Sequence, residues 1–482
     1  MKLFLLGMAI LIAGYFVYGK IVSAVLKPDD RETPAVANRD GVDFMVLPHW
    51  KNMLIQLLNI AGIGPVIGVI IGIRFGEIAF VIIPVGCILM GCVHDFVAGL
   101  MSMRHKGANL TELIRLTTGK HIYRVFSVFL CLALLLVVAV FINVPAKLMS
   151  GLVPGENSFL WWVGGIFVYY ICATLFPVDK IIGNIYPVFG MLLLLGTGAL
   201  LVMLLKCAWG DPALLTESAA FKAMKFTAEG NMPIIPMLFV TIACGIISGF
   251  HSTQAPIVAR TMRSEKQALH VFFGMMAAEG AIAMIWAAGA LAIYNQFPHL
   301  IGTDANGVLA KIVNHFLYSG LSIVVILSVV VLAITSGDTA MRSLRLSLAE
   351  IFHVNQKPIA LRLLLVFPLI AATLGLLLWS NKDAAGFAKL WNYFAWSNQV
   401  IAVFALLAGS IYLFSLRRPA FITVVPGMFI TFVVVTYILW NPIGLGIDLV
   451  YAEIVAGFVS LATYAWAKVR AGEVDLNELY TA

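Results

Sequence analysis

Apolar residues occur along this chain in long blocks separated by short polar connections. Each block is about as long as the 20 residues that a helix needs to cross the hydrocarbon core of a bilayer. The pattern predicts an all-α polytopic membrane protein with about thirteen spans, at residues 2–25, 53–73, 77–103, 125–149, 158–176, 182–206, 234–258, 268–294, 310–340, 361–379, 389–415, 421–440 and 447–467.

Two of these spans contain helix breakers near their middle. The first reads NIAGIGPVIGVIIGIRFG over 59–76, and the second reads ACGIISGFHSTQAPIVAR over 243–260. Backbone groups freed by a break cannot be satisfied by lipid, so such a segment must be covered by protein or line a wet cavity. We therefore predict discontinuous helices at Ala61–Pro65 and Gly245–Gln254; the alternative is a pair of kinked helices that only pack.

Each interrupted span begins a set of about five spans, and the two sets run in opposite orientations. Paired interruptions of this kind are the sequence sign of a secondary transporter's substrate site. We expect one transmembrane domain over 1–482, with inverted repeats at 53–206 and 234–415. The predicted substrate-binding residues in the two breaks are Ala61, Gly62, Ile63, Gly64, Pro65, Gly245, Ser248, Gly249, His251, Ser252 and Gln254. Outside the repeats we expect an N-terminal span at 2–25, two spans within 421–467 and a tail at 468–482.

Glycines recur every fourth residue after the first break, at Gly64, Gly68, Gly72 and Gly76. This spacing puts them on one helix face, where they allow another backbone to approach closely.

Composition and charge agree with a membrane setting. Hydrophobic residues make up 61% of the chain and charged residues 11%, too few to cover a soluble domain of this size. The net charge of +7 resides in short loops such as 104–124, 260–267, 342–345 and 417–419. By the positive-inside rule these loops are cytoplasmic, which predicts an outside N-terminus and a cytoplasmic C-terminus, and no nucleic-acid partner.

Sequence signatures of enzymes and metal sites are absent. The chain has no HExxH, GxSxG or Walker motif, and its six cysteines lie in or at the ends of apolar blocks without a CxxC pair. We expect no enzyme activity, no cofactor and no bound metal. A channel stays open as an alternative to a carrier, because broken helices also serve channels.

Ionisable residues inside the spans are costly and therefore need a partner or a role. Glu279 is our first candidate for proton coupling, since a carboxyl among apolar side chains can take up and release a proton; its alternative is a neutral packing carboxyl. His94 and Asp95 are either a proton relay or a polar knot, and as neighbours on a helix we expect them to point apart. His251 is either a functional group of the second break or a packing histidine.

Six motifs together resemble the carbon starvation protein A family, in its shorter form. They are AGIGPVIG, GCVHDFVAGLMSMRHKGANL, ACGIISGFHSTQAPIVARTM, AEGAIAMIWAA, SGDTAMRSLRL and WSNQVIAVFAL, between Ala61 and Leu406. The resemblance implies a transporter of the bacterial inner membrane with the five-plus-five inverted repeat of the amino acid–polyamine–organocation superfamily. It also implies uptake of peptides or of pyruvate, coupled to protons, in carbon starvation.

The same resemblance draws attention to hydroxyls in a later span. In the related superfamily, hydroxyls on the third helix of the second repeat join the first broken helix to bind sodium. Thr335, Ser336 and Thr339 stand at the corresponding place, which keeps sodium coupling open; the alternative is that they bond their own backbone. Asn398 and Gln399 either line the cavity or bridge helices, and we favour bridging.

Overall fold

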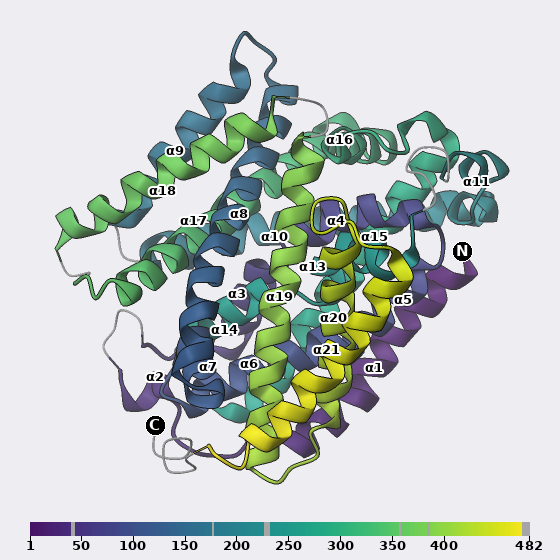
Figure 1. The fold of residues 1–482 in the computed structure, drawn as a ribbon. Coiled ribbons are helices and arrows are strands. Elements are labelled where there is room, and N and C mark those ends of the chain that lie inside the picture. The colour runs from purple at the N-terminus through teal and green to yellow at the C-terminus, as the bar shows by residue number, and fades with distance from the viewer. Residues whose placement is uncertain (40–43, 176–177, 226–231, 356–357, 383–385, 475–482) are drawn as a thin grey trace.

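The structure is a computed structural model, and it describes residues 1–39, 44–175, 178–225, 232–355, 358–382 and 386–474. In this part of the chain ten helices are long and apolar enough to cross a membrane, or eleven when a bent pair counts as one span. The two remaining expected spans are present as a shorter helix, α9 (Ser158–Leu175), and as the fragmented segment after residue 233. The predicted polytopic α-helical fold is confirmed (Figure 1).

The long continuous helices match the apolar blocks closely. They are α1 (Lys2–Leu26), α8 (Lys120–Leu152), α10 (Val178–Gly210), α15 (Met275–Gln296), α17 (Ser319–Ile351), α18 (Ile359–Ser380), α19 (Gly386–Ser415), α20 (Phe421–Trp440) and α21 (Leu449–Arg470). A further span consists of α5 (Ala79–Gly86), the π-helix η2 (Cys87–Gly91) and α6 (Cys92–Arg104).

The two interrupted spans are built from short pieces. The first is α3 (His49–Ile60) and α4 (Gly64–Gly72), followed by the 3-10 turn η1 (Ile73–Phe75). The second is the π-helix η4 (Ile234–Leu238), α12 (Phe239–Thr241), α13 (Ala243–Ile246) and α14 (Gly249–Ala259).

Short helices connect the spans. They are α2 (Pro34–Ala37), α7 (Leu110–Thr118), α11 (Ala219–Lys225), α16 (Ala305–Phe316), the 3-10 turns η3 (Pro212–Leu215), η5 (Glu265–Gln267) and η7 (Pro298–Leu300), and the π-helix η6 (Leu269–Gly274) that leads into α15.

Three expectations about boundaries are wrong. The span predicted at 310–340 begins only at Ser319, because residues 305–316 form the separate helix α16, whose apolar face covers protein. The segment 342–345 is not a loop but lies inside α17, since a helix keeps its hydrogen bonds beyond the hydrocarbon region. The loop at 104–124 contains the amphipathic helix α7. Part of the predicted tail, residues 475–482, lies outside the described residues.

The interrupted spans lie side by side and antiparallel at the centre of the bundle. The backbone N–H of Leu47, just before α3, donates to the carbonyl of Thr261, just after α14. At the other end, a Cβ on Gly68 would lie 2.8 Å from the Thr241 carbonyl of α12. The beginning of each segment therefore meets the end of the other, so the two interrupted spans run in opposite directions.

The glycine face of α4 is confirmed at three of its four positions. Cβ atoms on Gly64 and Gly72 would overlap side chains of Cys244 and Ile242, so these residues allow α4 to touch the second interrupted span. Gly76 is different: it follows η1 with φ of 97°, a left-handed conformation that favours glycine at the turn.

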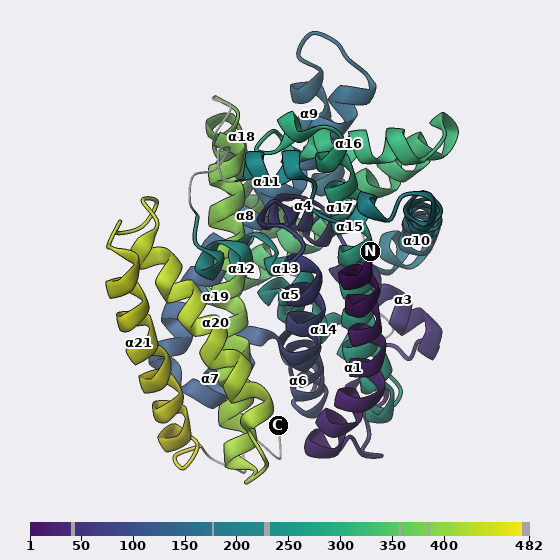
Figure 2. The same cartoon turned by 90° about the vertical axis from the view of Figure 1, so that its right-hand side faces the viewer.

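Helices outside this centre flank it on opposite sides, with α20 and α21 on one side and α1 on the other (Figure 2). The basic loops gather at one end of the bundle. There Arg104 forms a buried ion pair with Glu265 at 2.9 Å and donates to the Lys27 carbonyl at 2.8 Å, while Arg470 donates to the Thr117 carbonyl. We call this the arginine-rich end. The N-terminal ammonium lies at the other end, where it donates to the Leu215 carbonyl.

Candidate functional site

The first break is shorter than expected. Only Ala61, Gly62 and Ile63 leave the helix, and the two helical pieces meet at an angle of 46°. Gly64 and Pro65 already belong to the first turn of α4, where the missing N–H of proline costs no hydrogen bond. All five residues are buried, so protein covers the break.

The second break is also shorter than predicted, and it lies in the first half of the predicted range Gly245–Gln254. Ile247 and Ser248 are extended, with φ/ψ of −168°/128° and −129°/120°, whereas the polar run from Phe250 to Gln254 is helical. The helix resumes at Gly249, which leaves the first N–H groups of α14 without partners from the preceding turn.

Asn398 of α19 closes this break. Its Oδ1 accepts the backbone N–H of Phe250 at 2.7 Å, and its Nδ2 donates to the Ser248 hydroxyl at 2.8 Å. Gln399 next to it donates to the Phe239 carbonyl in α12 at 2.7 Å. Both amides therefore bridge α19 to the interrupted span, which is the role that the sequence analysis favours for them.

The structure also shows the contacts of the other candidate residues in the second break. Gly249 lies against the backbone of α19 and Gly245 against Val69 and Ala283, so both are positions of close packing. Ser252 donates to the Gly249 carbonyl of its own helix. Gln254 is fully buried, and its Oε1 has no partner among the described residues.

Four ionisable side chains from three helices form one buried chain. Asp95 lies at its centre: Oδ1 is 2.8 Å from His94 Nδ1, and Oδ2 is 3.1 Å from His251 Nδ1. The other ring nitrogen of His251, Nε2, is 3.6 Å from Glu279 Oε2. We call His94, Asp95, His251 and Glu279 the relay cluster. None of its members is more than 1% exposed.

The expectation that His94 and Asp95 point apart is wrong. Neighbours on a helix diverge at Cβ, but an imidazole is long enough to turn its Nδ1 back to the adjacent carboxylate. No sequence pattern indicated that His251 and Glu279 meet, although each was a candidate separately. Buried chains of Asp, Glu and His side chains serve as proton relays in membrane proteins.

The π-helices help to set the direction of these side chains. η2 ends immediately before α6, which carries His94 and Asp95, and η6 ends immediately before α15, which carries Glu279. The extra residue of a π-turn rotates the next helical segment by about 100° relative to a continuous α-helix.

Both ends of the relay cluster are open to a further partner. Within the described part of the chain, His94 Nε2 and both carboxyl oxygens of Glu279 have no hydrogen-bond partner. The described residues offer no set of three or more His, Cys, Asp or Glu that can hold a metal ion. Hydrogen bonds join His94, Asp95 and His251, and Glu279 lies beside them at ion-pair distance from His251.

Two polar residues of α3 were missed by the sequence analysis. Gln56 is fully buried, and neither its Nε2 nor its Oε1 has a partner among the residues described. Asn59, three residues later and on the same helix face, has an unsatisfied Oδ1. The sequence feature that could have identified them is an amide side chain inside an apolar span just before the break, because burying an amide without a hydrogen-bond partner costs free energy.

The three candidate hydroxyls of α17 do not all have the same hydrogen-bond partners. Thr335 and Thr339 donate to carbonyls of their own helix, at 3.0 and 2.8 Å. Ser336 faces the first break: a Cβ on Gly62 would lie 3.4 Å from its Oγ, which has no partner in the described residues.

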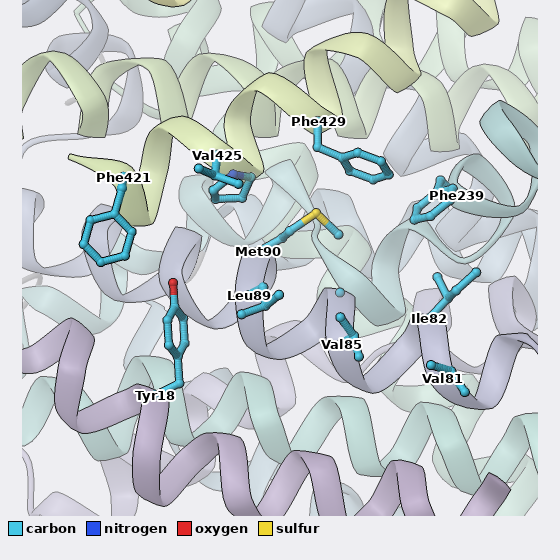
Figure 3. A pocket seen from close by; sticks show the side chains of 12 residues that line it. Tyr18, Val81, Ile82, Val85, Leu89, Met90, Phe239, Phe421, Val425 and Phe429 are labelled. Atoms are coloured by element: carbon cyan, nitrogen blue, oxygen red, sulfur yellow. The ribbon is translucent and has the colours of Figure 1, made fainter. Parts of the chain in front are cut away.

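A separate apolar groove of 410 Å³ lies between α1, the α5–η2 segment and α20 (Figure 3). The hydroxyl of Tyr18 is set in a lining of side chains such as Val85, Leu89, Phe239 and Phe429. With so few polar groups, this groove cannot orient a charged solute, and we do not assign the substrate to it.

Comparison with known proteins identifies the family. The family model described as carbon starvation protein CstA matches residues 1–176, 156–320 and 301–437. The chain belongs to this family. The CstA-family match covers both interrupted spans and the whole relay cluster.

Relatives of this CstA-family chain include a membrane protein of Haemophilus influenzae. The two are 39% identical over 340 residues, which cover 61% of this chain and 91% of the relative. The peptide transporter CstA of Campylobacter jejuni is 25% identical, with 88% of this chain and 78% of the relative covered. The pyruvate/proton symporter BtsT of Escherichia coli is 26% identical, but the match covers 55% of this chain and 45% of the relative. The family is one of transporters and not of enzymes.

Solved structures with the same fold include a transporter. A manganese transporter of Eremococcus coleocola superposes with a TM-score of 0.54 at 13% identity, covering 90% of this chain and 99% of the other. MhsT in complex with L-phenylalanine superposes with a TM-score of 0.57 at 11% identity, covering 88% and 99%. At these identities the likeness concerns the fold alone.

Proposed function

We propose that this protein is a secondary transporter of the bacterial inner membrane, which imports a small carboxylate-bearing carbon source together with protons. The observation that carries the proposal is the relay cluster, a buried chain of two carboxyls and two imidazoles beside an interrupted helix. The names of the relatives, peptide transporter and pyruvate/proton symporter, supply the two substrate classes.

The substrate lies between the two breaks in this proposal. Its polar groups would meet the break of α3–α4 and the unsatisfied amides of Gln56 and Asn59, which lead into that break. Interrupted helices supply exposed backbone dipoles to a ligand, so the antiparallel pair offers N–H groups from one segment and carbonyls from the other.

Charge balance explains why a carboxylate and a proton travel together. Adding one carboxylate to a site of low dielectric is costly unless a positive charge enters with it. A proton taken up by Glu279 or His251 removes that excess charge. Because Asp95 contacts both imidazoles, the proton can be shared along the cluster instead of resting on one group.

Alternating access follows from the same arrangement. The interrupted spans belong to the two proposed inverted repeats, and rocking of one repeat against the other would open the site to each side in turn. In this proposal the arginine-rich end is cytoplasmic, and the protein serves carbon uptake during starvation.

Sodium is the second candidate for the coupling ion. The observation in its favour is the unpartnered hydroxyl of Ser336 next to Gly62 in the first break, since sodium is held by hydroxyl and carbonyl oxygens at such a place. Thr335 and Thr339 contribute less to this candidate, because their hydroxyls bond their own helix.

Uptake by proteoliposomes tests the proposal. Pyruvate, a dipeptide and a tripeptide are each offered under an inward proton gradient and, separately, an inward sodium gradient. We expect accumulation of at least one of them under the proton gradient, and faster exchange when the vesicles contain unlabelled substrate. Channel-like flux without exchange acceleration contradicts a carrier, and accumulation under sodium alone selects the second candidate.

Glu279→Gln tests the relay cluster. The amide keeps the shape of the side chain but cannot take up a proton, so we expect gradient-driven accumulation to fall more than tenfold while exchange at equal pH continues. Glu453→Gln, on the outer helix α21, is the matched control and is expected to behave like the unmodified protein. Full accumulation by Glu279→Gln would remove Glu279 from the coupling mechanism.

A further inference from the structure

A polar cavity of 420 Å³ lies far from the relay cluster, at the end opposite the arginine-rich end. It is bounded by the last turns of α8, by α16 and by α17. Lys147 on its wall lies 27 residues after Lys120, the first residue of α8, which is about 40 Å along a helix. A cavity of a few hundred Å³ with a few polar groups is typical of a small-molecule site.

Two opposite charges line this cavity, and no ion pair joins them in the described part of the chain. Among the described residues, Lys147 has no carboxylate at ion-pair distance; its Nζ lies 4.6 Å from the ring centre of Phe387. In the same part of the chain, the Asp304 carboxylate accepts only from Asn306, at 3.0 Å from its Nδ2 and 3.4 Å from its backbone N–H. Both charged groups are therefore available to a bound molecule.

An amide in the same wall lacks a partner. Asn306 is 4% exposed, and its Oδ1 makes no hydrogen bond to any residue that the structure describes. A buried acceptor without a donor costs about 1–3 kcal/mol, which a ligand or a water molecule can offset. The cavity thus contains a cation, an anion and an unsatisfied acceptor.

A column of aromatic rings joins this cavity to the breaks. From Phe387 it continues to Trp391 with ring centres 6.2 Å apart, and from Trp391 to Phe394 at 5.3 Å. It ends beside both breaks, because Phe394 contacts Phe141 at 6.3 Å and Phe141 contacts Phe250 at 6.0 Å. A Cβ on Gly62 would also lie 3.2 Å from the Phe141 ring.

We propose that the cavity at Lys147 and Asp304 is a first binding subsite for the transported molecule, and that the aromatic column closes the path from it to the breaks. Lys147 holds the carboxylate of the incoming solute, and Asp304 binds an ammonium group where the solute carries one. This inference rests on the proposed function, since it takes the carboxylate-bearing substrate from it.

Transport measured separately from each face of the membrane distinguishes a loss of binding at this subsite from a defect in the relay cluster. Right-side-out and inside-out membrane vesicles with Lys147→Gln are assayed with pyruvate and with dialanine. We expect the KM for entry at the Lys147 face to rise about tenfold, as the loss of one charge-assisted contact implies. The KM at the opposite face stays as in the unmodified protein. Because a substitution cannot change the overall equilibrium, Vmax/KM falls by the same factor in both directions, so the maximal rate for entry at the opposite face falls about tenfold while that at the Lys147 face stays the same. Lys147→Arg restores the original values.

Lys311→Gln is the matched control. Lys311 belongs to α16 and also lies over a ring, 4.4 Å from the centre of Phe297, but it does not line the cavity. We expect its KM to be unchanged at both faces. Equal KM values for Lys147→Gln and the unmodified protein at both faces overturn the subsite, as does an equal effect of the two lysine variants.

Asp304→Asn distinguishes the two kinds of solute. Asparagine keeps the N-terminal cap of α16, so the helix is retained. We expect the KM for dialanine to rise at the Lys147 face and the KM for pyruvate to fall or stay the same, because only the peptide has an ammonium group. A larger rise in the KM for pyruvate than in the KM for dialanine, each relative to the unmodified protein, contradicts the assigned role of Asp304.

Direct binding gives a measurement that does not depend on transport. Calorimetric titration of the detergent-solubilised protein with pyruvate and dialanine is expected to show affinities about tenfold weaker for Lys147→Gln. Unchanged affinity for both solutes overturns the subsite. If the unmodified protein binds these solutes but accumulates neither under any gradient, the proposed function fails and the subsite stands.

Discussion

At the scale of single residues, polar groups in this protein are placed where the backbone or a charge needs them. Asn398 completes the hydrogen bonding of the second break, and Asp95 holds two imidazoles at once. Arg104 and Glu265 satisfy each other in a buried pair. Three of the residues that carry a buried polar atom without a partner among the described residues, Gln56, Asn59 and Ser336, lie just before the first break or face it. Their position supports the substrate site proposed there.

The role of Asn398 predicts the effect of its removal. Asn398→Ala leaves the Phe250 N–H and the Ser248 hydroxyl without this partner, which we expect to destabilise the protein by about 1–3 kcal/mol. The measurement is the thermal unfolding midpoint in detergent. Asn381→Ala, at the exposed C-terminal cap of α18, is the control and is expected to change stability by less than about 0.5 kcal/mol. Equal midpoints for the two variants contradict the capping role.

At the scale of elements, the two interrupted spans form one unit. α4 reaches α12 and α13 through its glycine face, and α3 runs beside α14. The breaks are short, three residues in the first and two in the second, so most backbone hydrogen bonds are kept while the local direction of the chain changes. Small residues at the contact let the backbones meet, since packing and not hydrophobicity holds helices together in lipid.

The glycine contact predicts a coupled pair of substitutions. A methyl group at Gly72 overlaps the Ile242 side chain, so Gly72→Ala is expected to cost about 1–3 kcal/mol of stability. In an Ile242→Ala background the same methyl group loses this overlap, and we expect it to cost less than about 1 kcal/mol. Thermal unfolding of the four proteins in detergent measures this difference.

Gly198→Ala is the matched control for the glycine contact. Gly198 lies inside α10, and a methyl group added there would have nothing within 4 Å, while alanine favours the helix by up to about 1 kcal/mol. An equal loss of stability for Gly72→Ala in both backgrounds would show that the Ile242 contact is not its cause.

At the scale of the whole molecule, charge is distributed unequally between the two ends. Arg104, Arg260, Arg418 and Arg470 all bond backbone carbonyls at the arginine-rich end, and so tie loops far apart in sequence to one surface. The opposite end carries the N-terminus and the cavity at Lys147 and Asp304. We propose from the positive-inside rule that the arginine-rich end faces the cytoplasm.

Thiol labelling tests this orientation. In a protein whose six cysteines are replaced by alanine, we introduce Leu445→Cys, in the exposed connection after α20, and Lys266→Cys, at the arginine-rich end. We expect a membrane-impermeant maleimide to label Leu445→Cys on intact cells and Lys266→Cys only after permeabilisation. The reverse pattern would place the N-terminus in the cytoplasm.

The sequence by itself determined the fold class, the approximate spans, the existence of two breaks and the glycine face of α4. These features depend on local properties: the length of an apolar block, the missing N–H of Pro65 and the four-residue spacing of glycines. The bilayer makes these local patterns more informative, because backbone N–H and C=O groups without hydrogen-bond partners are tolerated there only where protein or a water-filled cavity covers them. The sequence also placed Glu279, His94, Asp95 and His251 among the candidates, since charge inside a span is conspicuous.

Only the tertiary structure decided which of these residues meet. The relay cluster joins α6, α14 and α15, and the contact between His251 and Glu279 depends on how three helices are rotated about their axes. π-Turns before two of those helices shift that rotation, and no local pattern predicted them. The same holds for Asn398 at the second break and for Lys147 and Asp304 in one cavity: each pair is more than 140 residues apart, and only packing brings them together.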